Sequence, residues 1–243
     1  MKSLKDGLAI WQILNSNIIT DIIGKSGFDI AILDLEHGLH TPKTIQDCVF
    51  TAKANSLFTI ARLPSCSYEN LVQLIDTGVD AILFPHIETK SQLNKIINQS
   101  FLPPLGNKSF SPFVPKFNYE KSDEGLIKNP HLGILIESIL GINNAEELLK
   151  EQNIDFVYFG AYDLSVEINK PGEIFNSEIV NYLKNLIKHA KNYKKKILAI
   201  YRNKKELDLL NQLGVDIPVA SVDTSHLIMK LKEEKENYLK IKN

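Results

Sequence analysis

Cysteine is scarce in this chain, with only Cys48 and Cys66 among 243 residues. Two cysteines are too few for a disulfide framework, and neither has the spacing to other ligands that is typical of a metal site. The scarcity excludes the small, disulfide-stabilised class of secreted protein and favours a reducing cytoplasm as the home of this chain.

Long apolar runs are missing as well. No segment approaches the roughly 18 apolar residues that a membrane-spanning helix needs. The first fourteen residues, MKSLKDGLAIWQIL, lack the apolar region and the small-residue cleavage site of a signal peptide. The net charge of −1 gives no overall field that would attract nucleic acid or anionic lipid. We therefore expect neither a membrane nor a nucleic acid as a partner.

Eight short apolar segments are present, and each precedes a longer segment with helical character. The predicted strands span residues 7–14, 28–34, 58–63, 80–85, 132–138, 155–160, 195–201 and 216–223. Strands that alternate with helices indicate a parallel sheet, and nearly continuous apolar strands indicate burial on both faces. Eight such units in a chain of 243 residues favour a (β/α)8 TIM barrel over an open doubly wound sheet, which stays the alternative.

The remaining segments indicate no second domain and no linker, so we expect one barrel domain over residues 1–243 with a core at about 7–230. Residues 102–125 contain four prolines, which predicts a lid or an interface loop. We expect one helix over 143–152, a loop between the sixth strand and a helix that begins at residue 177, and a solvated helix face in the charged segment 230–243.

Active sites of such barrels lie at the carboxyl ends of the strands, so polar residues at those ends are candidates. The candidates are Gln12 or Asn15, Asp34, Glu36, His37, Arg62, His86, Glu137, Tyr162, Asp163, Arg202 and Asp223. Glu137 and Asp163 end consecutive strands, and two close carboxylates need a cation between them. They predict either a site for a hard divalent cation or two acids that cap the following helices.

Arg62 follows an apolar run, and a buried arginine needs an anionic partner. That partner is either a core carboxylate or a substrate carboxylate or enolate. His37 has an acid, Asp34, three residues before it, which can fix the histidine tautomer and make it a stronger base. A helix-capping histidine is the alternative. His86 has no acid at such a spacing, and we interpret it as structural or as a surface residue.

Six motifs, in this order, resemble the HpcH/HpaI aldolases, metal-dependent class II pyruvate aldolases related to the citrate lyase β subunit. They are DLEHG (34–38), the arginine of ARLP (61–64), PPLG (103–106), LIES (135–138), GAYDLS (160–165) and SVDTSHL (221–227). The resemblance covers residues 7–230 and implies a divalent ion (Mg²⁺, Mn²⁺ or Co²⁺), a pyruvate and an aldehyde substrate, and a homo-trimer or homo-hexamer with an exchanged last helix.

The resemblance also implies residue roles. They are His37 as catalytic base, Asp34 as its acidic neighbour, Arg62 as the transition-state cation, Glu137 and Asp163 as metal ligands, the backbone N–H groups of Tyr162 and Asp163 as carboxylate donors, and Asp76 as the residue that makes His37 more basic. Because Asp76 falls on a predicted helix, it would act through packing or across a subunit contact.

Two departures from the family pattern bear on the choice of substrate. Leu135 stands where many members carry glutamine, and Lys108-Ser109 replaces a common Arg-Gly. Lys108 keeps a positive charge for substrate binding but lacks the planar fork of arginine. No lysine ends a predicted strand, which argues against a Schiff base. An acyl-CoA lyase of the malyl- or citramalyl-CoA type, with Lys108 and Lys116 near its nucleotide, and a non-catalytic keto-acid-binding barrel are the alternative functions.

Overall fold

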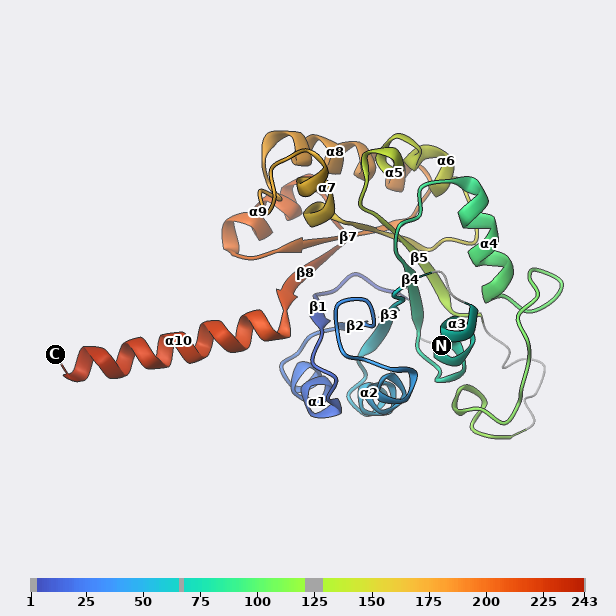
Figure 1. Cartoon of the computed structure of the whole chain (residues 1–243), viewed down its shortest axis with the longest axis horizontal. Helices are drawn as coiled ribbons and strands as arrows, with labels where there is room; N and C mark the ends of the chain where they lie inside the picture. Colours follow the sequence, from blue (N-terminus) through green and yellow to red (C-terminus); the bar gives the residue numbers. More distant parts are fainter. Residues whose placement is uncertain (1–3, 66–67, 121–128, 243) are drawn as a thin grey trace.

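The computed structural model describes residues 4–65, 68–120 and 129–242, and its eight strands form a closed barrel (Figure 1). The strands are β1 (Ala9–Gln12), β2 (Ile30–Asp34), β3 (Phe58–Arg62), β4 (Ala81–Phe84), β5 (His131–Ile136), β6 (Phe156–Phe159), β7 (Lys196–Tyr201) and β8 (Ile217–Val222). Every neighbouring pair is parallel, and β1 pairs with β8 to close the barrel. The predicted TIM barrel is confirmed, and the open sheet is excluded.

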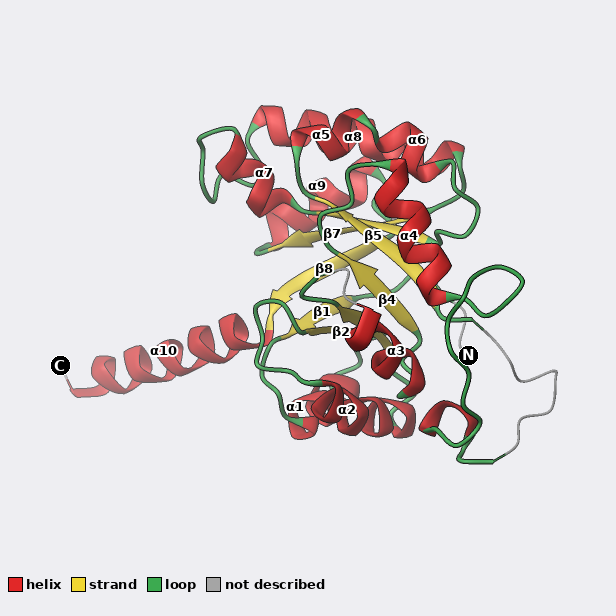
Figure 2. Ribbon diagram, turned by 45° about the vertical axis from the view of Figure 1, so that its right-hand side comes forward, coloured by secondary structure: helices red, strands yellow, loops and turns green. Residues whose placement is uncertain are grey.

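Helices surround the barrel on the outside (Figure 2). They are α1 (Asn17–Lys25), α2 (Pro42–Ala54), α3 (Tyr68–Asp76), α4 (Lys90–Ser100), the 3-10 turn η1 (Pro115–Phe117), α5 (Ile139–Asn143), α6 (Ala145–Leu149), α7 (Ala161–Glu167), α8 (Ser177–Asn192), α9 (Lys204–Leu213) and α10 (Asp223–Lys242). All residues of β2 and β3 are buried, as expected for strands covered on both faces. None of the described helices is long and apolar enough to cross a membrane.

Two local predictions differ from the structure. The helix expected at 143–152 is present but shorter, as α6, and it is preceded by a helix that was not expected, α5, which Ser138 caps by accepting the Gly141 N–H. The loop expected between the sixth strand and the helix at 177 contains the helix α7, which begins directly after Gly160. Since α7 starts at the end of β6, its first turn lies at the carboxyl end of the barrel.

The connection from α4 to β5 contains the predicted lid segment, 102–125, of which 121–125 lie outside the described residues. A connection from a helix to the next strand lies at the amino end of a barrel, opposite the active-site end. Its turn η1 packs against the end of α3, where a Cβ on Gly78 would lie 3.3 Å from Cα of Lys116. The lid interpretation is therefore wrong for the pocket of the same chain, whereas an interface loop stays a prediction.

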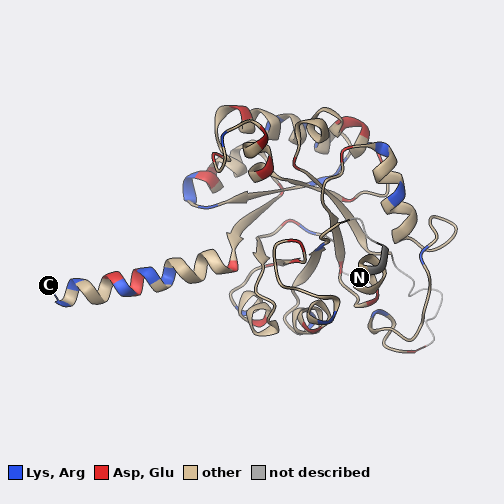
Figure 3. Cartoon of the chain, in the orientation of Figure 1, with Lys and Arg blue, Asp and Glu red and all other residues tan. Residues whose placement is uncertain are grey.

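The last helix, α10, leaves the barrel and extends away from it (Figure 1). Its first residue, Asp223, is buried and accepts the backbone N–H groups of Ile13 and Leu14. Lysines and glutamates alternate along its distal half (Figure 3), as predicted for a solvated face. Its proximal half, however, exposes Leu227, Ile228 and Leu231. That apolar surface is unusual for a helix that only faces water.

Candidate active site

A cavity of about 290 Å³ opens at the carboxyl end of the barrel. Its lining residues are Trp11, Ile13, Asp34, His37, Arg62, Leu135, Glu137, Tyr158, Gly160, Ala161, Tyr162, Asp163, Ile200 and Val222. The lining includes six predicted site residues, namely Asp34, His37, Arg62, Glu137, Tyr162 and Asp163. Residues that are far apart in the sequence thus meet in one place because each follows a barrel strand.

Asp34 and Arg62 form a buried ion pair that lines this cavity. They are direct neighbours across β2 and β3, and the Arg62 Nε and Nη2 atoms lie 2.9 and 2.6 Å from the two Asp34 carboxylate oxygens. Burial opposes the charge of Arg62, but the hydrogen bonds and charge of Asp34 raise its pKa above the usual value. The guanidinium is therefore held in a fixed plane that still faces the cavity.

The predicted role of Asp34 as the orienter of the His37 ring needs correction. Besides Arg62, the Asp34 carboxylate accepts the backbone N–H groups of Glu36 at 2.9 Å and His37 at 3.3 Å. Asp34 thus positions the turn that carries His37 rather than the imidazole itself. The His37 side chain is exposed at the mouth of the cavity, where an incoming molecule can reach it.

Trp11 and Tyr158 form one wall, which the sequence reasoning missed. The Trp11 indole N–H donates to the Tyr158 hydroxyl over 2.7 Å, and the guanidinium carbon of Arg62 lies 4.5 Å from the Trp11 ring centre. Burial raises the pKa of Tyr158, so the phenol stays neutral and can act as an acceptor. Both residues lie inside strands rather than at polar strand ends, and only their inward direction could have marked them.

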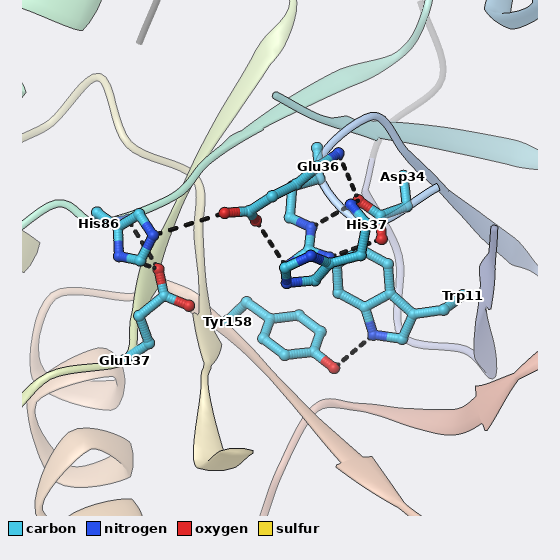
Figure 4. Close-up of polar contacts among 8 residues, drawn as sticks. Trp11, Asp34, Glu36, His37, His86, Glu137 and Tyr158 are labelled. Carbon is cyan, nitrogen blue, oxygen red and sulfur yellow. Dashed lines mark hydrogen bonds and ion pairs between the residues drawn. The ribbon is translucent and has the colours of Figure 1, made fainter. Parts of the chain in front are cut away.

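His86 connects two acids from other strands, and Figure 4 shows it between them. Its Nδ1 lies 2.8 Å from Oε1 of Glu137, and its Nε2 lies 3.5 Å from Oε1 of Glu36. The second oxygen of Glu36, Oε2, lies 2.9 Å from Nη1 of Arg62. His86 is exposed, as the interpretation as a surface residue predicted, but it does have acid partners. These partners follow β2 and β5, and no sequence spacing reveals them.

Glu137 and Asp163 form the carboxylate pair that the strand ends predicted. Burial raises the pKa of Glu137 to about 8, against the effect of the His86 backbone N–H, and the charges of Asp163 and Glu36 add to the increase. Gly160 permits the close approach of the two strand ends, since a Cβ there would lie 2.3 Å from Cβ of Glu137. Nearby carboxylates oppose the ionisation of the buried Glu137 carboxyl, and a bound cation would remove that repulsion. The site is therefore suited to binding a cation.

The donor set fits a hard divalent ion that takes few protein ligands. Within the described ranges, no three His, Cys, Asp or Glu side chains are arranged to enclose a metal ion. Two carboxylates, Glu137 and Asp163, remain beside a cavity with room for water and substrate oxygens. Mg²⁺ and Mn²⁺ commonly bind in this way, with substrate and water completing an octahedron.

Comparison with known proteins places this geometry in a family. The sequence model of the HpcH/HpaI aldolase/citrate lyase family matches residues 8–229. The chain belongs to this family. The resemblance read from the six motifs is thereby confirmed.

Relatives of known activity are similar to most of the chain. A hydroxypyruvate/pyruvate aldolase of Roseobacter denitrificans is 26% identical over 189 residues, which are 73% of this chain and 72% of that protein. A 5-keto-4-deoxy-D-glucarate aldolase of Klebsiella pneumoniae is 24% identical over 196 residues, 77% of this chain and 75% of that protein. The prediction of a carbon–carbon lyase of the aldolase type is confirmed by the family and by these two relatives.

A solved structure supports the fold independently. It is an HpcH/HpaI aldolase/citrate lyase family protein from Burkholderia cenocepacia, with a TM-score of 0.90 at 16% identity, over 96% of this chain and 95% of that chain. At this identity the likeness concerns the barrel alone. The eight-stranded barrel described above is therefore the fold of an HpcH/HpaI family member.

Two residues assigned through the HpcH/HpaI resemblance lie outside the cavity. Asp76 ends α3 near the start of β4, and its Oδ1 accepts a hydrogen bond from Nζ of Lys108 over 2.8 Å. Lys108 is buried there and also donates to the Ser109 carbonyl. Within one chain the structure thus joins Asp76 to Lys108 at the amino end of the barrel and separates both from His37.

Proposed function

We propose that this family member is a class II aldolase that cleaves or forms a 2-keto-4-hydroxy acid from pyruvate and an aldehyde. One observation carries the proposal: the Glu137–Asp163 carboxylate pair lines the same cavity as Arg62 and His37. Forming and stabilising a pyruvate enolate requires positive charge and a base. A cation site and a fixed guanidinium supply the charge, and an exposed histidine supplies the base.

Each residue has a distinct task in this proposal. Glu137 and Asp163 would hold a divalent cation, which supplies positive charge for the developing enolate. Arg62 adds a second positive charge in an orientation fixed by Asp34 and Glu36. His37 takes the proton from the 4-hydroxyl group during cleavage and returns it during synthesis.

The carboxylate of pyruvate has a place in the same cavity. The first turn of α7 contains Tyr162 and Asp163, and the backbone N–H groups of a first turn have no partner within the helix. Gly160 precedes the helix and supplies no capping side chain that would satisfy them. We assign these N–H groups to the substrate carboxylate, as the family resemblance implies.

The positions of the lysines argue against both the Schiff-base mechanism and the acyl-CoA lyase. Burial lowers the pKa of Lys116 to about 8, helped by the charge of Lys108, so Lys116 has the character of a nucleophilic amine. It lies in η1 at the amino end of the barrel, however, and no lysine lines the described cavity. The same position separates Lys108 and Lys116 from any nucleotide of an acyl-CoA substrate at the mouth.

Removal of the divalent ion tests the proposal. We expect EDTA to abolish retro-aldol activity and Mn²⁺, Mg²⁺ or Co²⁺ to restore it, because Arg62 alone does not compensate the enolate charge. The measurement is pyruvate release from a 2-keto-4-hydroxy acid, coupled to lactate dehydrogenase. Full activity in EDTA, or covalent trapping of pyruvate by borohydride, would contradict the proposal and point to a Schiff base.

The acyl-CoA alternative is separated by a second assay on the same preparation. Acetyl-CoA and glyoxylate are supplied with metal, and formation of the condensed acyl-CoA thioester, which keeps its CoA, is followed by liquid chromatography. We expect no new thioester above the control without enzyme. Formation of the thioester at a rate above that of pyruvate aldol formation would favour the acyl-CoA lyase.

We further propose that α10 packs on a second copy, within the homo-trimer or homo-hexamer that the family resemblance implies. A second cavity of about 300 Å³ lies between α1, β1 and the start of α10, and Ile10, Ile19 and Phe28 are among its lining residues. The exposed Leu227 and Leu231 of α10 offer apolar surface of the matching kind. A subunit contact is also where Asp76 could approach the His37 of another copy.

Leu227→Glu combined with Leu231→Glu should shift the chain toward the monomer, because two charges cannot be buried at an apolar contact without a large cost. Size-exclusion chromatography with light scattering measures the mass. Lys184→Glu, an exposed change on α8, is the control and should keep the parent mass. A monomeric parent chain would contradict this assembly.

A further inference from the structure

His86 makes an arrangement with Glu137 that neither the motifs nor the proposed roles use. Its ring Nδ1 and its own backbone N–H both lie within hydrogen-bond distance of one oxygen, Oε1 of Glu137, at 2.8 and 2.9 Å. Two donors on one oxygen fix the plane of that carboxylate. The other oxygen, Oε2, lies on the side of Gly160 and Tyr158, which line the cavity (Figure 4).

The backbone at His86 makes this double contact possible. Its φ of 54° is in the left-handed region, which few residues other than glycine adopt; histidine, asparagine and aspartate do so more often than others. Left-handed residues outside glycine cost free energy and cluster at functional sites. Here the unusual backbone turns both the amide and the ring of the same residue toward Glu137.

The far side of the ring faces a second acid. Nε2 lies 3.5 Å from Glu36, and Glu36 in turn contacts Arg62 at 2.9 Å. His86 on the β4 end therefore connects the carboxylate of the β5 end with the acid–guanidinium pair of the β2 and β3 ends. The contacts run without a break through the ends of four consecutive strands.

We infer that His86 is a positioning residue that holds the Glu137 carboxylate in the orientation needed to bind a divalent cation. The inference rests on the proposed function, since it gives Glu137 the same role. Donors that orient a metal-binding carboxylate commonly affect metal affinity as much as they affect turnover. In this role Nδ1 donates to Glu137, and His86 is not among the residues that line the cavity.

Two substitutions separate the ring from the backbone. His86→Gly accepts the left-handed backbone and keeps the amide donor but loses the ring. His86→Asn also tolerates that backbone and places an amide donor close to the position of Nδ1. His86→Gln is a third variant, whose amide lies one bond farther out and cannot replace Nδ1.

The experiment measures Mn²⁺ binding to the full chain after chelator treatment, from the electron paramagnetic resonance signal of free Mn²⁺. We expect His86→Gly and His86→Gln to weaken Mn²⁺ affinity by about 10- to 100-fold. His86→Asn should stay close to the parent affinity. At saturating Mn²⁺, the KM for the keto acid should be nearly unchanged, because the substrate contacts are intact. Circular dichroism melts in EDTA check that each variant is folded.

The outcomes are distinguishable. Equal Mn²⁺ affinity in the parent and a folded His86→Gly would overturn the role of His86 and leave the proposed function standing. A folded His86→Asn as weak as His86→Gly would also overturn it, because the Nδ1 donor would then not be the cause. A parent chain that binds no Mn²⁺ would overturn the proposed function itself, and this inference with it.

Discussion

Replacing Glu137 with glutamine should lower aldolase turnover by about 10³-fold. The substitution keeps the size and one acceptor oxygen of the side chain but removes the charge that would hold a divalent cation next to Asp163. A metal ion contributes several kcal/mol to the stabilisation of a developing enolate, and a loss of about 4 kcal/mol corresponds to about 10³-fold in rate. Steady-state pyruvate release at saturating Mn²⁺ measures the effect, and Mn²⁺ affinity should fall in parallel.

The stability of the same variant distinguishes lost chemistry from misfolding. Because burial raises the pKa of Glu137 from 4.5 to about 8, the folded state holds its proton over a pH range in which the unfolded chain releases it. The contribution of this group to the free energy of unfolding is therefore fully present below pH 4.5 and is lost as pH rises toward 8, as long as no cation is bound. Glutamine has no proton to release, so the metal-free variant should melt at or above the parent temperature at pH 8.

Glu147→Gln provides the matched control for Glu137→Gln. Glu147 is an exposed acid on α6 and does not line the cavity, so its substitution should change neither turnover nor Mn²⁺ affinity. If Glu137→Gln retains more than a tenth of the parent turnover while remaining folded, Glu137 does not carry the cation and the proposed mechanism loses its basis.

The barrel could be predicted from sequence because its signal is local. Each strand is a short apolar run, and each predicted strand end lies within two residues of the observed one. The site residues that follow strands were accessible for the same reason: once the barrel is assumed, Arg62, Glu137 and Asp163 must converge at one end. The family resemblance added Asp76, which strand-end reasoning alone does not select.

The side-chain contacts that could not be predicted from the sequence depend on pairing between strands. Asp34 and His37 are close in sequence, which suggested a contact with the imidazole, yet the carboxylate binds the backbone N–H of His37 and the guanidinium of Arg62 from the next strand. His86 had no acid at a spacing that suggested a contact, yet it contacts Glu137, which is 51 residues away. Such partners are set by barrel register and by the unusual φ of His86, and neither follows from residue spacing.

The lid interpretation of residues 102–125 was wrong for a different reason. The length and prolines of this segment indicate an irregular connection, but they do not say which end of the barrel it occupies. The element order does say so: the sequence already predicts a helix before the segment and a strand after it, as the structure has them, and such a connection lies at the amino end. Lys108 and Lys116 move with it to the amino end, which turns two apparent substrate residues into neighbours of Asp76.

His37→Ala should lower turnover by about 10²–10⁴-fold and leave KM nearly unchanged. General-base catalysis contributes this much, and His37 lines the cavity with its ring exposed at the mouth. Binding of the keto acid is assigned to other groups, namely Arg62, the first turn of α7 and the cation, so ground-state affinity should persist. Initial rates over a range of keto-acid concentrations at saturating Mn²⁺ give kcat and KM separately.

The half-buried His189 on α8 is the control, and its alanine variant should keep both constants. A further comparison uses the exchange of the pyruvate methyl protons with deuterium in solvent. That exchange forms the enolate without the aldehyde, so it tests whether His37 serves only the 4-hydroxyl proton. If His37→Ala turns over at the parent rate, His37 is not the base. If turnover falls but methyl exchange persists, the proton of the 4-hydroxyl is the step that His37 serves, as its place at the cavity mouth indicates.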